Sequence, residues 1–145
     1  MCYMVYIGTK KPLETKKWQS SLMSIKKLKA TEKEIATYFK NPNIYFIASS
    51  KGCSCEFRIA MERELGFDIP KDWYPESKDQ IDGTKLIYQL IKETLKHAEK
   101  IELLSIWNDH IGNKITKEHI SLKEVPENKF RMFEDMMFIC RNLIL

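Results

Sequence analysis

Three short apolar runs set the strongest limits on what this chain can fold into. They occupy residues 2–7, 44–48 and 101–107, and each is followed by glycine or by polar residues. Continuous apolar runs of this length are typical of β-strands that are buried on both faces. We therefore expect these three segments to form the centre of a sheet. Residues 23–28 give a weaker strand signal, with lysines facing outward.

Short helices are predicted on either side of the second apolar run. Thr31 and Glu34 have the spacing of a capping box, in which each side chain accepts a hydrogen bond from the backbone of the other residue. This spacing predicts a helix over residues 31–40. Residues 57–65 also fit a short helix, because Gly66 follows them and favours a helix end.

The longest helix is predicted over residues 84–98, where leucine, isoleucine and alanine recur on one stripe. This amphipathic segment lies between the second and third apolar runs. A helix in that position is typical of a right-handed crossover between two parallel strands. We therefore expect residues 44–48 and 101–107 to run in the same direction.

The remaining segments carry weaker signals. Residues 67–83 contain two prolines and end in glycine, and they read as a surface loop that Trp73 and Tyr74 anchor. Residues 120–125 alternate like an edge strand. Residues 130–142 fit either a helical face or a strand, and we predict a strand.

These elements predict a single domain, residues 1–145, of the α/β or α+β class. Its core is a mixed sheet of about five strands with two main helices packed on it. Apolar residues make up 43% of the chain, which is sufficient for a hydrophobic core. The apolar start has no basic lead and no cleavage site, so we read it as a strand and not a signal peptide. With only four cysteines, we expect reduced thiols in the cytoplasm and no membrane association.

Positive charge is concentrated in the first third of the chain. Residues 1–51 contain ten lysines and three glutamates, a balance of +7, but no arginine. Arginine is the side chain that binds phosphates and base edges in a bidentate manner. We therefore interpret these lysines as a solvated surface, and nucleic acid as an unlikely partner.

The most distinctive motif is a Cys-x-Cys segment directly after the second apolar run. Cys53 and Cys55 are separated by one residue, which places both thiols on the same side of an extended segment. Such a pair binds a soft metal or forms a strained disulfide during a redox cycle. The alternative is structural, because free cysteine is among the commonest core residues.

Asp109 and His110 follow the third apolar run, as Cys53 and Cys55 follow the second. Parallel strands end at the same edge of a sheet, where α/β proteins usually build their sites. We therefore predict a candidate thiol or metal site made of Cys53, Cys55, Asp109 and His110. The alternative is a polar turn that carries a solvated histidine.

The sequence contains none of the common catalytic motifs that would indicate an enzyme. The sequence has no phosphate-binding glycine loop, no nucleophile elbow and no HExxH zinc motif. Cys2 is set aside as an N-terminal nucleophile, because it begins an apolar strand without evident activating neighbours. We expect a binding or interaction domain with no cofactor, which binds a protein partner or forms a homo-oligomer. The alternative function is the thiol-dependent site, metal-binding or redox, at Cys53 and Cys55.

Overall fold

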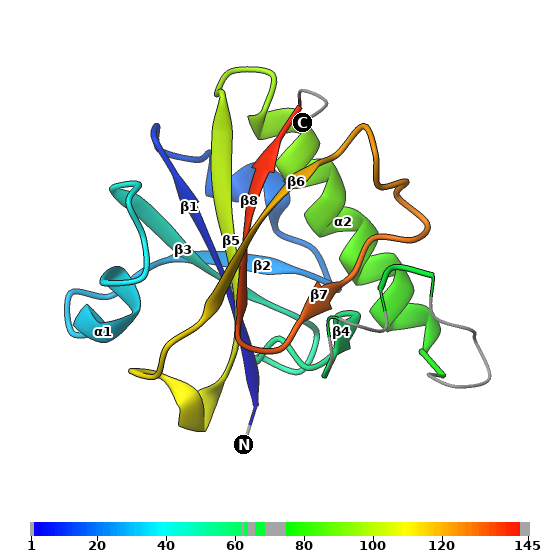
Figure 1. Cartoon of the computed structure of the whole chain (residues 1–145), viewed down its shortest axis with the longest axis horizontal. Helices are drawn as coiled ribbons and strands as arrows, with labels where there is room; N and C mark the ends of the chain where they lie inside the picture. The colour runs from blue at the N-terminus through cyan, green and yellow to red at the C-terminus, as the bar shows by residue number, and fades with distance from the viewer. Residues whose placement is uncertain (1, 62, 64–65, 69–74, 143–145) are drawn as a thin grey trace.

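A computed structural model describes residues 2–61, 63, 66–68 and 75–142 and shows an α+β fold (Figure 1). The main sheet has six strands in the order β2-β3-β1-β5-β8-β6. These strands are β1 (Tyr3–Thr9), β2 (Ser24–Lys27), β3 (Asn43–Ala48), β5 (Lys100–Trp107), β6 (Thr116–Ser121) and β8 (Met136–Arg141). Two short strands, β4 (Ile59–Ala60) and β7 (Met132–Phe133), pair in parallel beside it. The helical elements are η1 (Thr15–Trp18), α1 (Lys33–Ala36), α2 (Lys78–Thr94) and η3 (Asn108–His110).

The three apolar runs form the centre of the sheet, as predicted. β1 lies between β3 and β5 and is antiparallel to both. β3 and β5 therefore run in the same direction, as the sequence predicts, but they are not neighbours. All other pairs in the main sheet are antiparallel except β6 with β8, so the predicted mixed sheet is confirmed with six strands. The predicted strands at residues 23–28 and within 130–142 are confirmed as β2 and β8.

α2 begins earlier than predicted. Its first turn is closed by a capping box in which the Ser77 side chain accepts from the Gln80 backbone and the Gln80 side chain accepts from Ser77. The predicted loop up to residue 83 is wrong from residue 78 onward, because these residues form the first turns of α2. Gly83 is a buried helical residue, and a Cβ there would lie 3.1 Å from the Phe57 ring. Glycine thus allows close packing of α2, at a modest cost in helix propensity.

Both predicted short helices need correction. α1 spans only Lys33–Ala36, and Glu32 at its N-cap makes no side-chain cap, so the predicted Thr31 capping box is wrong. Glu32 accepts instead from the backbone of Lys29, which closes a turn before the helix. Residues 59 and 60 of the predicted helix 57–65 form β4, because pairing with β7 satisfies their backbone.

The edge strand predicted at residues 120–125 is found a few residues earlier in the sequence, as β6. β6 is an edge strand, but it ends at Ser121, and the chain then turns. The Tyr88 hydroxyl of α2 donates to the carbonyls of Leu122 and Val125 and so fixes this turn against the helix. Trp73 and Tyr74, the predicted loop anchors, lie outside the described residues.

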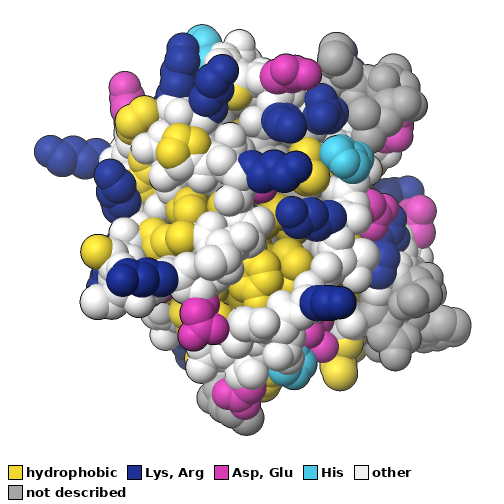
Figure 2. Space-filling model, turned by 60° about the vertical axis from the view of Figure 1, so that its left-hand side comes forward, with side chains coloured by type: hydrophobic (Ala, Val, Ile, Leu, Met, Phe, Trp, Pro, Cys, Tyr) yellow, Lys and Arg dark blue, Asp and Glu magenta, His cyan; other side chains and the backbone are white. Residues whose placement is uncertain are grey.

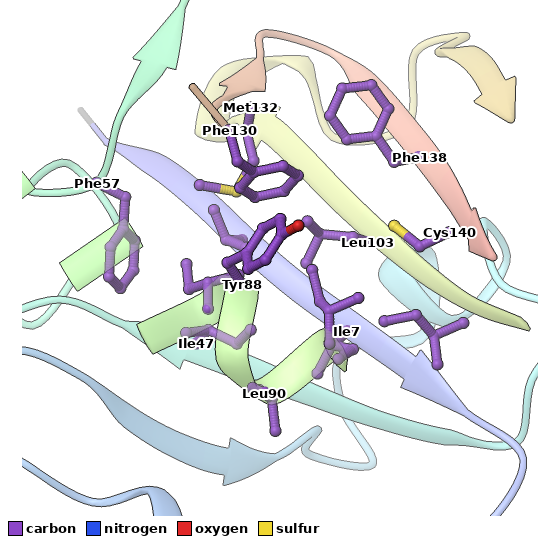
Figure 3. Packing of buried hydrophobic residues seen from close by; sticks show 14 of the residues in the cluster. Ile7, Ile47, Phe57, Tyr88, Leu90, Leu103, Phe130, Met132, Phe138 and Cys140 are labelled. Atoms are coloured by element: carbon purple, nitrogen blue, oxygen red, sulfur yellow. The ribbon is translucent and has the colours of Figure 1, made fainter. Parts of the chain in front are cut away.

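α2 covers one face of the sheet and forms the main core with it (Figure 3). Aromatic rings converge at the end of this core near β7, where Phe130 lies 5.5 Å from Tyr88 and 6.3 Å from Phe138 between ring centroids. Burying a side chain of this size contributes roughly 1.5–3 kcal/mol. Cys140 lies in the same core and is fully buried.

The opposite face of the sheet has a smaller core, which α1 and the segment after η3 partly cover. All ten lysines of residues 1–51 are exposed. Figure 2 shows Lys and Arg side chains spread over one side of the molecule, with hydrophobic side chains visible between them. Among the described residues, none of the helices has the length and apolar character that crossing a membrane requires.

Candidate functional site: a cysteine cluster at one edge of the sheet

Four chain segments that are distant in the sequence meet at one end of the central strands, along one side of the sheet. β1 starts there and β5 ends there, because Tyr3 pairs with Trp107. β3 ends at the same edge, since Val5 near the start of β1 pairs with Ile47. In Figure 1 the start of β1, the loop after β3, η3 and the turn between β7 and β8 all lie in the lower part of the molecule. We call this the thiol edge.

The Cys-x-Cys loop is fastened to the sheet by its middle residue. Ser54 is fully buried, and its hydroxyl accepts from the Val5 backbone at 2.9 Å and donates to the Ile47 carbonyl at 2.6 Å. Gly52 makes the preceding turn with φ +83°, a conformation that favours glycine. With Ser54 pointing inward, Cys53 and Cys55 on either side of it stay half-exposed.

Cys2 completes a group of three thiols. The Sγ atoms of Cys2, Cys53 and Cys55 all lie within 4.8 Å of one another, and each residue is half-buried. The backbone N–H of Tyr3 donates to Cys55 Sγ at 3.3 Å. We call this group the cysteine cluster. The sheet brings its members together, because the start of β1 lies beside the end of β3.

The cluster gives its thiols unequal acidity. Partial burial tends to raise the pKa of Cys53, but hydrogen bonds from the Cys55 backbone and the Cys2 thiol outweigh it and lower that pKa below its ordinary value. Burial and the adjacent Cys53 sulfur raise the pKa of Cys55 to about 12. A thiolate therefore forms more readily at Cys53 than at Cys55.

His110 belongs to a second group at the same edge. Its Nδ1 lies 2.6 Å from Asp135 Oδ2, and the ligand atoms of His110, Glu134 and Asp135 lie within 4.8 Å of one another. We call this the carboxylate–histidine cluster. Asp109 is exposed and belongs to neither group. Of the four residues predicted from the sequence, Cys53 and Cys55 lie in the cysteine cluster and His110 lies in the carboxylate–histidine cluster, whereas Asp109 lies outside both.

Three residues of these clusters were missed by sequence reasoning. The sequence places Cys2 at the start of an apolar strand, but in the structure it lies one residue before β1, at the thiol edge, and is only half-buried. Glu134 and Asp135 form the turn between β7 and β8, and the sequence signal for that turn is weak. His97 and His119 are exposed and belong to neither cluster.

The fold and this edge define the molecule as an α+β protein with a three-cysteine cluster at the end of its central strands. No protein-family model, curated protein or solved structure matches the chain.

Proposed function

We propose that this protein binds a thiophilic metal ion, of the Zn²⁺ or Cu⁺ class, through Cys2, Cys53 and Cys55. The observation that carries the proposal is the convergence of three thiols from two distant segments within 4.8 Å. Thiolates are the ligands that such ions prefer. The proposal gives a ligand to the non-catalytic binding domain that the sequence indicates.

The spacing of the sulfurs supports a shared ion. With a zinc–sulfur bond of about 2.3 Å, sulfurs on one tetrahedral ion lie about 3.8 Å apart. The observed limit of 4.8 Å requires only small side-chain rotations to reach that distance. Because all three thiols are half-buried, the ion retains an open coordination position for solvent or an exchange partner.

Acidity supports the same interpretation. Metal ligation by cysteine requires the thiolate, so binding begins most easily at the thiol with the lowest pKa. The lowered pKa of Cys53 makes it a better first ligand than Cys55. The bound cation then favours the thiolate forms of Cys2 and Cys55, which lose their protons as the ion is bound.

A metal titration tests the proposal. Reduced protein is titrated without oxygen with Cd²⁺, whose thiolate complexes absorb in the ultraviolet, and with Zn²⁺ as competitor. We expect saturation at one ion per chain, and an affinity loss of at least about tenfold in Cys2→Ser, Cys53→Ser and Cys55→Ser. Cys140→Ala is the matched control and leaves binding unchanged, because Cys140 is buried away from the edge. Absence of thiolate absorption in the wild type contradicts the proposal.

A second candidate function is a redox reaction with peroxide, in which Cys53 forms a disulfide with a neighbouring cysteine. The lowered pKa of Cys53 favours this reaction. The Cys53 thiolate attacks hydrogen peroxide, the O–O bond breaks, and a sulfenic acid forms with release of hydroxide. Cys2 or Cys55 then attacks that sulfur and forms a disulfide with loss of water. Mass spectrometry of peroxide-treated protein tests this candidate, which requires a new disulfide at Cys53 and a free Cys140.

Location and partners are part of the proposal. Free, clustered thiols persist in a reducing compartment, so we place the protein in the cytoplasm. A protein partner or a second copy of the chain, as predicted from the sequence, is compatible with an open coordination position. Light scattering with and without metal measures whether binding changes the oligomeric state.

A further inference from the structure

The carboxylate–histidine cluster is a separate chemical environment from the cysteine cluster. It combines one imidazole and two carboxylates, His110, Glu134 and Asp135, with ligand atoms within 4.8 Å of one another. We propose that these three side chains bind a divalent cation that prefers oxygen and nitrogen ligands, of the Mn²⁺ class. This site goes beyond the thiol site and does not depend on it.

Each carboxylate is oriented by a donor that lies outside the cluster. The Trp107 backbone N–H donates to Asp135 Oδ1 at 3.2 Å, and the Tyr3 hydroxyl donates to Glu134 Oε1 at 2.9 Å. Outer hydrogen bonds of this kind hold ligating carboxylates in metal sites. They come from β1 and β5, so the two central strands position the site.

Asp135 occupies a backbone conformation that a glycine adopts more easily. Its φ is +54°, the left-handed region, in which residues other than glycine are uncommon. The turn between β7 and β8 therefore carries a side chain at a position where glycine fits without strain. That side chain contacts both His110 and the Trp107 backbone. The carboxylate is thus held by two elements of the thiol edge.

An ion pair alone does not explain the cluster. The imidazole and the Asp135 carboxylate are about a third exposed, and exposed ion pairs contribute roughly 0–1 kcal/mol. A single His–Asp pair also does not account for Glu134, whose carboxylate accepts from the Tyr3 hydroxyl and lies within the same 4.8 Å group. A divalent cation matches two carboxylates in charge, and an exposed site lets water complete its coordination shell.

Mn²⁺ is the probe that separates the two clusters. Carboxylates suit Mn²⁺, whereas thiolates select softer ions. Reduced full-length protein is titrated with Mn²⁺, and the electron paramagnetic resonance signal of the free aqueous ion reports binding. We expect one ion per chain in the wild type. In Glu134→Gln and in His110→Ala we expect a rise in Kd of at least about tenfold.

Asp109→Asn is the matched control, because Asp109 is a neighbouring carboxylate outside the cluster. We expect it to bind Mn²⁺ as the wild type does, and Cys53→Ser likewise. Thermal unfolding of each variant checks that the fold is kept. The proposal is overturned if the wild type leaves the free-ion signal unchanged at millimolar Mn²⁺, or if Asp109→Asn weakens binding as much as Glu134→Gln. Loss of Mn²⁺ binding in folded Cys53→Ser also overturns it, since that result assigns the ion to the thiols.

Discussion

Cys53 and Cys140 have identical side chains but lie in environments that differ in burial and in hydrogen bonding. Cys140 lies in β8 under α2, fully buried, and burial alone raises the pKa of its thiol well above the ordinary range. Cys53 lies at the thiol edge, half-exposed, and hydrogen bonds lower its pKa despite some burial. The comparison separates a cysteine that fills space from one that is available for chemistry, which the sequence alone does not distinguish.

The two settings also differ in what holds them together. The core under α2 is stabilised by apolar area, with Phe130 and Phe138 in contact with neighbouring rings. The thiol edge is held by polar contacts, notably those of Ser54 with β1 and β3. A substitution in the core is therefore expected to change stability, and one among the edge thiols to change chemistry.

The largest expected effect is in the core. Phe130→Ala removes a fully buried ring and leaves a cavity, so we expect a loss of about 3–5 kcal/mol in the free energy of unfolding. Cys53→Ser at the edge is expected to cost less than about 1 kcal/mol. Denaturant unfolding of both variants measures the difference, and a comparable loss in Cys53→Ser contradicts the division into core and edge.

Ser54→Ala tests the attachment of the Cys-x-Cys loop. The substitution leaves the buried Val5 N–H and Ile47 carbonyl without the serine hydroxyl, at a cost of about 1–3 kcal/mol. The loop should also loosen, so Cd²⁺ affinity should fall although every thiol is retained. Unchanged unfolding and metal affinity in this variant would show that Ser54 does not position the cysteines.

Smaller effects are expected at the helix caps. Ser77→Ala removes the cap of α2 and should cost about 0.5–2 kcal/mol. Thr31→Ala removes the residue at which the sequence predicts a cap, and we expect a change within about 0.5 kcal/mol, because α1 has no side-chain cap. Thermal unfolding of the pair compares the two sites, and an equal loss would argue for a cap at Thr31.

The smallest difference concerns the pH dependence of thiol reactivity. Alkylation requires the thiolate, so a lowered pKa shifts the rise in rate to lower pH and a raised pKa shifts it to higher pH. Cys53 should therefore react at lower pH than an unperturbed thiol. Cys55, whose pKa is raised by burial and by the adjacent Cys53 sulfur, should react at higher pH than Cys53. Site-resolved mass spectrometry over a pH series measures both, and identical profiles contradict the assigned acidities.

The sequence predicts the centre of the fold because apolar runs encode burial directly. The runs at residues 2–7, 44–48 and 101–107 became β1, β3 and β5, and the common direction of β3 and β5 followed from the helix between them. Helix ends were predicted less well. The sequence contains two capping-box patterns, one at Thr31 and one at Ser77. Only the pattern at Ser77 begins a helix that is long enough to pack on the sheet.

The site was predicted only in part because it depends on long-range pairing. Cys53, Cys55 and His110 follow strands whose direction the sequence indicates, and they do reach one edge. Cys2 joins them only because β1 inserts antiparallel between those strands. Glu134 and Asp135 arrive through the turn before β8. Neither arrangement leaves a local pattern in the sequence.

The most direct test of the shared thiol site is site-resolved alkylation of native, reduced protein with and without one equivalent of Zn²⁺. We predict that the ion protects Cys2, Cys53 and Cys55 together, and that Cys140 is alkylated only after denaturation. At a free concentration one hundred times Kd, the ion should also add about 2.7 kcal/mol to the free energy of unfolding. If Zn²⁺ leaves the three edge thiols as reactive as before, the cysteine cluster is not a metal site.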